Sequence, residues 1–165
     1  MTVTDELIAN NDAFVASFPQ RPAPDSGPTV AVVACMDHRM DIHAMLGLRP
    51  GQAQVIRNAG GIIAEDQIRS LSISQHLLGT EEIILIHHTD CGMQRFTDEQ
   101  FKADLKAQTG VEPDWEPQAF TDLDADVRKS IGRILESPFI PRKHSVRGFV
   151  YDVETGRLRE VTPGA

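Results

Sequence analysis

Residues 29–41 read TVAVVACMDHRMD, and this stretch determines how the rest of the chain is interpreted. It opens with an uncharged apolar run, Val30 to Ala34, and then changes to Cys35, Asp37 and Arg39. An apolar run closed by polar residues is typical of a strand that is buried on both faces of a parallel sheet. Because ligands bind at the carboxyl ends of strands in open α/β sheets, we expect the chemistry to lie at this end.

A second stretch, residues 81–92, repeats the design as EEIILIHHTDCG. Its apolar run is followed by His88 and Cys91. The chain between the two stretches is long enough for a crossover, a strand and a helix, which would bring the two apolar strands side by side. Neighbouring strands lie about 5 Å apart, so Cys35, His88 and Cys91 can converge on one point.

Two thiolates and an imidazole are ligands that Zn²⁺ prefers, and three protein ligands with an open fourth position are typical of a catalytic zinc site. A structural zinc site would need a fourth ligand, which His38, His87 or Asp37 could supply. The spacing alone does not decide between these two kinds of site.

Two other chemistries fit the cysteines less well. A cysteine-dependent phosphatase needs a full phosphate-binding loop between its cysteine and arginine, and Arg95 follows Cys91 too closely for that. A redox switch between Cys35 and Cys91 would leave the neighbouring ionisable residues unexplained. His43 and His76 are assigned no role.

Composition limits the class of protein. The 165 residues suit one domain, and the net charge of −8 with scattered basic residues argues against a nucleic-acid or anionic-membrane partner. The first residues are acidic, and no apolar run approaches the length of a membrane span. We therefore expect a cytoplasmic protein, in which cysteines serve metal binding or catalysis more often than disulfides.

The N-terminal region, residues 1–28, is predicted to be a helix over 4–18 followed by a proline-rich arm. The helix carries one apolar stripe, so it either reaches over a neighbouring subunit or packs on its own domain. Residues 29–165 form a single α/β domain in this interpretation. Its expected elements after the first strand are a short helix (40–46), a strand (53–57), a helix (65–78), a strand from 82, a helix opened by a capping box at 97–100, a helix (123–135) and a hairpin (145–153 and 157–161). This alternation predicts a parallel sheet with one antiparallel edge strand.

Cys35-x-Asp37-x-Arg39 together with His88-x-x-Cys91 resembles the motifs of the β-class carbonic anhydrases, especially the short actinobacterial and archaeal-type members. The likeness covers nearly the whole chain. It implies that Cys35, His88 and Cys91 bind one Zn²⁺ per chain and that Asp37 and Arg39 form a dyad beside the metal. It also implies a sheet ordered 2-1-3-4 with helices on both faces, and a homodimer or dimer of dimers with sites near the subunit interface.

The resemblance implies reversible hydration of CO₂ to bicarbonate and a proton by zinc-bound hydroxide. Two thiolates cancel the formal charge of the metal, so we expect activity to rise on the alkaline side. Arg39 would keep Asp37 ionised and turned away from zinc. If this clamp loosens, Asp37 can become the fourth ligand and close the site, in some members in response to pH.

Alternatives remain within and outside this activity. The same site could hydrolyse carbonyl sulfide or carbon disulfide, or the chain could be a non-catalytic, zinc-stabilised interaction protein. Arg57 matches the anion-binding arginine of the family members regulated by bicarbonate, but Val32 stands where those members have Trp, so we expect no bicarbonate pocket. His38 replaces the usual Ser, and because histidine titrates near neutrality, we expect it to pass protons to buffer.

Overall fold

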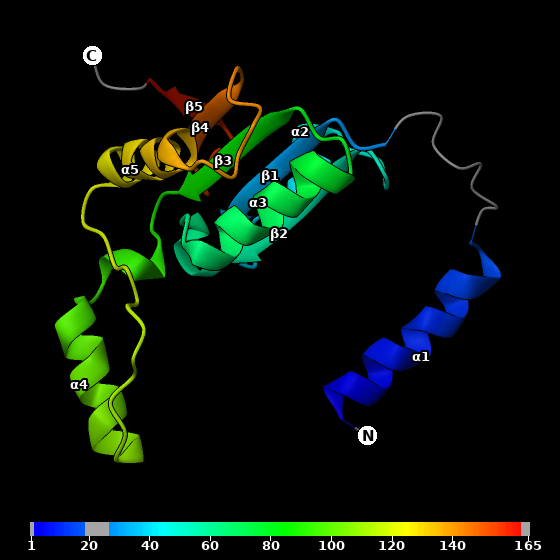
Figure 1. The fold of residues 1–165 in the computed structure, drawn as a ribbon. Helices are drawn as coiled ribbons and strands as arrows, with labels where there is room; N and C mark the ends of the chain where they lie inside the picture. The colour runs from blue at the N-terminus through cyan, green and yellow to red at the C-terminus, as the bar shows by residue number, and fades with distance from the viewer. Residues whose placement is uncertain (1, 19–26, 163–165) are drawn as a thin grey trace.

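The computed structural model describes residues 2–18 and 27–162 (Figure 1). The predicted proline-rich arm falls mostly on residues 19–26, which lie outside the described residues. In chain order the elements are α1 (Val3–Ala16), β1 (Val30–Cys35), α2 (Ile42–Leu46), β2 (Ala53–Asn58), the 3₁₀ turn η1 (Ala59–Gly61), α3 (Glu65–Leu77), β3 (Glu82–His88), the 3₁₀ turn η2 (Gly92–Gln94), α4 (Asp98–Thr109), α5 (Leu123–Glu136), β4 (Val146–Tyr151) and β5 (Leu158–Val161).

The strands form one sheet in the order β2-β1-β3-β4-β5. The pairs β1–β2, β1–β3 and β3–β4 are parallel, and only β5 runs antiparallel to its neighbour among the described strands. Both the predicted order and the antiparallel edge strand are confirmed. The continuous apolar run of β1 has the expected cause, since residues from Ala31 to Ala34 are fully buried.

Helices cover both faces of the sheet, as predicted. Because side chains alternate along a strand, Ala31 and Val33 face a core shared with α3 and α5, whereas Val32 and Ala34 face a second core. The second core includes α2 and the segments around η1 and η2. In Figure 1, α3 and α5 lie in front of the sheet and α2 lies behind it.

The ends of the helices follow the predicted signals with one difference. Gly47 ends α2 in the left-handed conformation, and the Thr97 hydroxyl caps α4 by accepting a hydrogen bond from the backbone N–H of Gln100. Among the described residues, the Gln100 side chain does not accept the return bond from the Thr97 backbone N–H that would complete the predicted capping box, and its amide nitrogen donates to Asp104 Oδ1. Leu78 and Leu135, at the C-terminal ends of α3 and α5, are 50% and 42% exposed.

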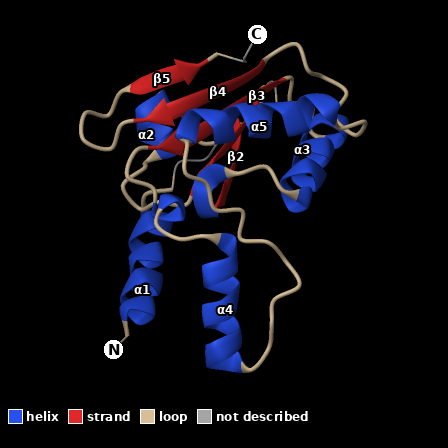
Figure 2. Cartoon of the chain, turned by 90° about the vertical axis from the view of Figure 1, so that its left-hand side faces the viewer, coloured by secondary structure: helices blue, strands red, loops and turns tan. Residues whose placement is uncertain are grey.

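Two helices, α1 and α4, extend away from the sheet (Figures 1 and 2). The helix α1 has no buried residue, and its apolar stripe is exposed, with Leu7 at 62% and Phe14 at 53%. The stripe that the sequence predicts is therefore present, but within one chain nothing described covers it.

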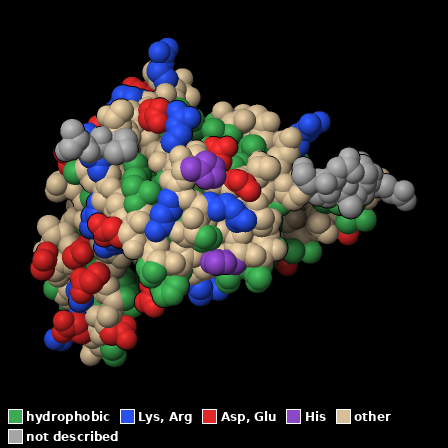
Figure 3. All heavy atoms as spheres, turned by 45° about the horizontal axis from the view of Figure 1, so that its top comes forward, with side chains coloured by type: hydrophobic (Ala, Val, Ile, Leu, Met, Phe, Trp, Pro, Cys, Tyr) green, Lys and Arg blue, Asp and Glu red, His purple; other side chains and the backbone are tan. Residues whose placement is uncertain are grey.

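The described surface is mixed in charge. Acidic and basic side chains are interspersed on the face shown in Figure 3, and acidic side chains gather on the projection that α4 forms. Within the described residues, no helix is both long enough and apolar enough to span a membrane.

Candidate metal centre

The candidate site lies where the strand order reverses. The chain passes from β1 to β2 on one side and then to β3 on the other, so the carboxyl ends of β1 and β3 are neighbours at a topological switch point. Cys35 is the last residue of β1 and His88 is the last residue of β3, while Cys91 lies three residues further on, directly before η2. The fold therefore brings the two sequence motifs to one edge of the sheet.

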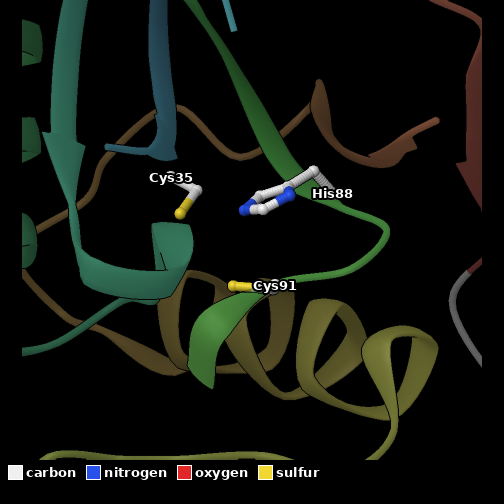
Figure 4. Close-up of side chains that lie close together, drawn as sticks. All are labelled: Cys35, His88 and Cys91. Atoms are coloured by element: carbon white, nitrogen blue, oxygen red, sulfur yellow. The ribbon is translucent and has the colours of Figure 1, made fainter. Parts of the chain in front are cut away.

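Three donor atoms meet there (Figure 4). The ligand atoms of Cys35, His88 and Cys91 all lie within 4.8 Å of one another, and all three residues are buried. His88 Nδ1 lies 2.8 Å from the carbonyl oxygen of Thr89, which can only accept, so Nδ1 carries the proton and Nε2 presents a lone pair. That Nε2 atom is buried and has no hydrogen-bond partner among the described residues. An orphaned imidazole nitrogen beside two free thiols fits a Zn²⁺ ion.

The titration of these groups also suits a cation. A hydrogen bond from the Cys91 thiol lowers the pKa of Cys35 to about 4, and the same bond raises the pKa of Cys91. Burial is the largest single effect on His88 and opposes its charged form, but the interactions with Cys35, Thr89 and Asp37 together raise its pKa. The three groups thus share protons around one thiolate, and binding a metal would displace those protons.

Asp37 and Arg39 form a tight pair beside these donors. Arg39 Nε donates to Asp37 Oδ1 at 2.9 Å, and Nη2 donates to Oδ2 at 2.8 Å. The Arg39 backbone N–H also donates to Oδ1, at 2.9 Å. These bonds, with the side-chain bonds from Arg39 as the main cause, hold the pKa of Asp37 well below its usual range. Asp37 Oδ2 lies 3.7 Å from His88 Nε2, so the carboxylate borders the candidate metal position.

Hydrogen bonds from Arg57 hold the loop that carries this pair. Arg57, on β2, donates to the carbonyl oxygens of Cys35, Asp37 and Met40 at 2.7–3.0 Å. Its guanidinium is thereby committed to the backbone of the loop that follows β1. Gly61 packs so closely under the ends of β1 and β3 that an added Cβ would lie 2.7 Å from the Cys35 nitrogen.

Comparison with known proteins agrees with this geometry. A sequence model of the carbonic anhydrase family matches residues 30–115. The chain is 53% identical to beta-carbonic anhydrase 1 of Mycobacterium tuberculosis over 164 residues, which cover 99% of this chain and 100% of that protein. The chain belongs to the β-class carbonic anhydrases. The crystal structure of the carbonic anhydrase from Streptococcus mutans superimposes with a TM-score of 0.91 at 43% identity, covering 98% of this chain and 99% of that one. The carbon disulfide hydrolase of Saccharolobus solfataricus is 39% identical over 153 residues, covering 78% of this chain and 75% of that protein.

Within this carbonic anhydrase, the structure brings together all five residues that the sequence singles out, namely Cys35, Asp37, Arg39, His88 and Cys91. It separates the histidines proposed as alternative fourth ligands from the donors. His87 points to the other face of the sheet, where its Nε2 lies 2.9 Å from Asp126 Oδ2, and His38 is exposed. Only Asp37 among those three candidates borders the donors, and Arg39 holds its carboxylate.

Sequence reasoning missed several residues that shape this carbonic anhydrase site. Asp90 lies inside the second motif but had no assigned role, although Arg39 Nη1 donates to its Oδ2 at 2.9 Å. Its position between the candidate ligands His88 and Cys91 was a usable signal. The hydrogen bond between His88 and the Thr89 carbonyl oxygen, and the close packing of Gly61, depend on backbone geometry, and the residue types in the sequence do not predict them.

Proposed function

We propose that the Cys35, His88 and Cys91 side chains of this β-class carbonic anhydrase bind one Zn²⁺ and that the chain uses it for the reversible hydration of CO₂ to bicarbonate and a proton. The observation that carries the proposal is the buried, unpartnered His88 Nε2 facing two free thiols. An unpaired polar atom in a dry site costs stability unless something binds it, and zinc is the ion that this donor set suits.

When bound, zinc supplies a water of lowered pKa as the nucleophile. The chain provides the remaining parts. Asp37 Oδ2 faces the donors and is placed to accept a hydrogen bond from the attacking water, which orients its lone pair. Arg39 holds both oxygens of Asp37, so the carboxylate stays ionised and does not itself fill the open position. Thr89 fixes the His88 tautomer through its carbonyl oxygen.

CO₂ is a better supported substrate than its sulfur analogues. The similarity to a carbonic anhydrase extends over the full length of both chains at 53% identity. The similarity to the carbon disulfide hydrolases is lower, at 31–39% identity. The intact Asp37–Arg39 pair also argues against a non-catalytic zinc protein, because a purely structural metal site needs no such clamp.

We further propose that the protein works as a homodimer, or a dimer of dimers, in the cytoplasm. The exposed apolar stripe of α1 supports a second copy as its partner, because a stable amphipathic helix needs an apolar surface to cover. The two unoxidised, closely spaced cysteines suit a reducing compartment.

The proposal is tested by comparing substrates. Zinc-loaded protein is assayed for CO₂ hydration by stopped flow and for carbon disulfide hydrolysis by sulfide release, with Cys91→Ser as the metal-site variant. We expect CO₂ hydration that Cys91→Ser abolishes together with stoichiometric zinc binding. Sulfide release without CO₂ hydration would assign the chain to the other activity.

A further inference from the structure

Asp90 joins the two loops that carry the metal site. It lies between His88 and Cys91, and it accepts two hydrogen bonds from Arg39, which belongs to the loop after β1. Arg39 Nη1 donates to Asp90 Oδ2 at 2.9 Å, and Arg39 Nη2 donates to the Asp90 carbonyl at 3.1 Å. Asp90 therefore links the loop that carries one thiol to the loop that carries the other two donors.

A second arginine holds the free oxygen of the same carboxylate. Arg95, directly after η2, donates from Nη2 to Asp90 Oδ1 at 2.5 Å. The Asp90 carboxylate is thus fixed between two guanidinium groups, one on each oxygen. Its backbone is left-handed, with φ of 53°, a conformation that aspartate and asparagine tolerate better than most residues.

Arg39 is therefore bound by a carboxylate on each side. Its Nε and Nη2 hold Asp37, while its Nη1 holds Asp90. An arginine bound to Asp37 alone could move together with that carboxylate. An arginine that also binds a fixed carboxylate on the other loop has its guanidinium plane fixed, and a planar bidentate partner then fixes Asp37.

We propose that Asp90 is a positioning residue, which holds Arg39 and through it keeps the Asp37 carboxylate beside the metal position rather than on it, with Arg95 fixing the other oxygen of Asp90. This inference rests on the proposed function of the site. Asp37 Oδ2 is already 3.7 Å from His88 Nε2, so a small movement of the pair would bring the carboxylate into the fourth position. Asp90 therefore determines how often the site is open to substrate.

The test uses Asp90→Asn, which keeps the size of the side chain and its tolerance of the left-handed backbone but removes the charge. The matched control is Glu160→Gln, which removes a carboxylate charge from the Arg147–Glu160 pair between β4 and β5. Crystal structures of the zinc-free and zinc-loaded proteins report the positions of Arg39 and Asp37, and stopped-flow assays give kcat and KM.

We expect Asp90→Asn to displace Arg39 in both structures and to place an Asp37 oxygen on zinc in a fraction of molecules. Because the ion pairs are partly exposed, we expect kcat to fall about two- to fivefold, with KM changed little, while Glu160→Gln matches the wild type in kcat. Arg95→Ala should lower kcat less, and should have no further effect in the Asp90→Asn background, because it acts through Asp90.

Wild-type positions of Arg39 and Asp37 in the Asp90→Asn structures, with an unchanged kcat, would overturn the inference. An effect of Arg95→Ala that adds fully to that of Asp90→Asn would overturn the part assigned to Arg95. If the wild-type protein binds zinc and does not hydrate CO₂, the proposed function fails, whereas the zinc-free structures still decide whether Asp90 positions Arg39.

Discussion

Gly61 gives a quantitative test of how the fold positions Cys35, the first proposed zinc ligand. An added Cβ at this residue would lie 2.7 Å from the Cys35 nitrogen, 2.9 Å from the Ile86 carbonyl oxygen and 3.0 Å from the Ala34 carbonyl carbon. All three are backbone atoms at the ends of β1 and β3, so no side chain can rotate away. The backbone is also left-handed at Gly61, with φ of +70°.

The expected cost of Gly61→Ala has two parts. A left-handed backbone costs a residue with a Cβ about 1–2 kcal/mol, and overpacking a tight site costs about 1–3 kcal/mol more. Gly110→Ala is the matched control, because Gly110 has φ of +77° but nothing within 4 Å of the added Cβ. We therefore expect losses of about 2–5 kcal/mol for Gly61→Ala and about 1–2 kcal/mol for Gly110→Ala.

Thermal unfolding at one protein concentration, in chelator-treated samples, compares the two variants without a contribution from metal binding. For a domain of this size each kcal/mol shifts Tm by about 2–4 °C, so Gly61→Ala should melt several degrees below Gly110→Ala. Gly61→Ala should also weaken zinc binding about tenfold or more, as loss of a supporting contact does, because the backbone of Cys35 must move. Equal melting temperatures for the two variants would refute the close packing argued here.

Three further predictions concern groups around the site. Asp126→Asn should lower the free energy of unfolding by about 1–3 kcal/mol, because it weakens the 2.9 Å bond to the fully buried His87; denaturant titration measures this, and unchanged stability would show that the bond contributes nothing. The pKa of Asp124 is lowered mainly by its hydrogen bond with Arg159, so the ionised carboxylate stabilises the fold fully above about pH 4, the ordinary range of a carboxyl group, and this contribution is lost as pH falls through the lowered native pKa. Asp124→Asn should therefore reduce the difference in unfolding free energy between neutral and acid pH by less than about 1 kcal/mol. An unaltered pH profile in urea titrations would contradict this. If the exposed His38 imidazole passes protons to buffer, His38→Ala should slow CO₂ hydration in dilute buffer and not in concentrated buffer; equal stopped-flow rates in dilute buffer would remove that role.

The fold was predictable because its two central strands, β1 and β3, are largely buried on both faces. The uncharged run from Val30 to Ala34 and the run that precedes His88 can only be stable inside a parallel sheet, and the structure places both there. The glycines after α2 and α4 also marked the helix ends.

The site was predictable to the level of its residue types and not of its supports. Two thiols, an imidazole and an ion pair at the ends of two strands indicate a metal centre, and the topology of the sheet brings these groups together. Arg57 had been matched to an anion-binding residue, but its guanidinium binds backbone carbonyls, which only the loop geometry reveals. The bridge through Asp90 likewise depends on a left-handed residue that places its carboxylate between two arginines.

The most direct test of the central claim is the CO₂ hydration rate of protein carrying one zinc per chain, measured by stopped flow from about pH 6.5 to 9. We predict rates far above those of buffer alone that climb toward alkaline pH, as expected for a zinc ion whose charge is cancelled by the thiolates of Cys35 and Cys91. A protein that holds its zinc at these residues and yet leaves the rate at the level of buffer throughout this range would contradict the account.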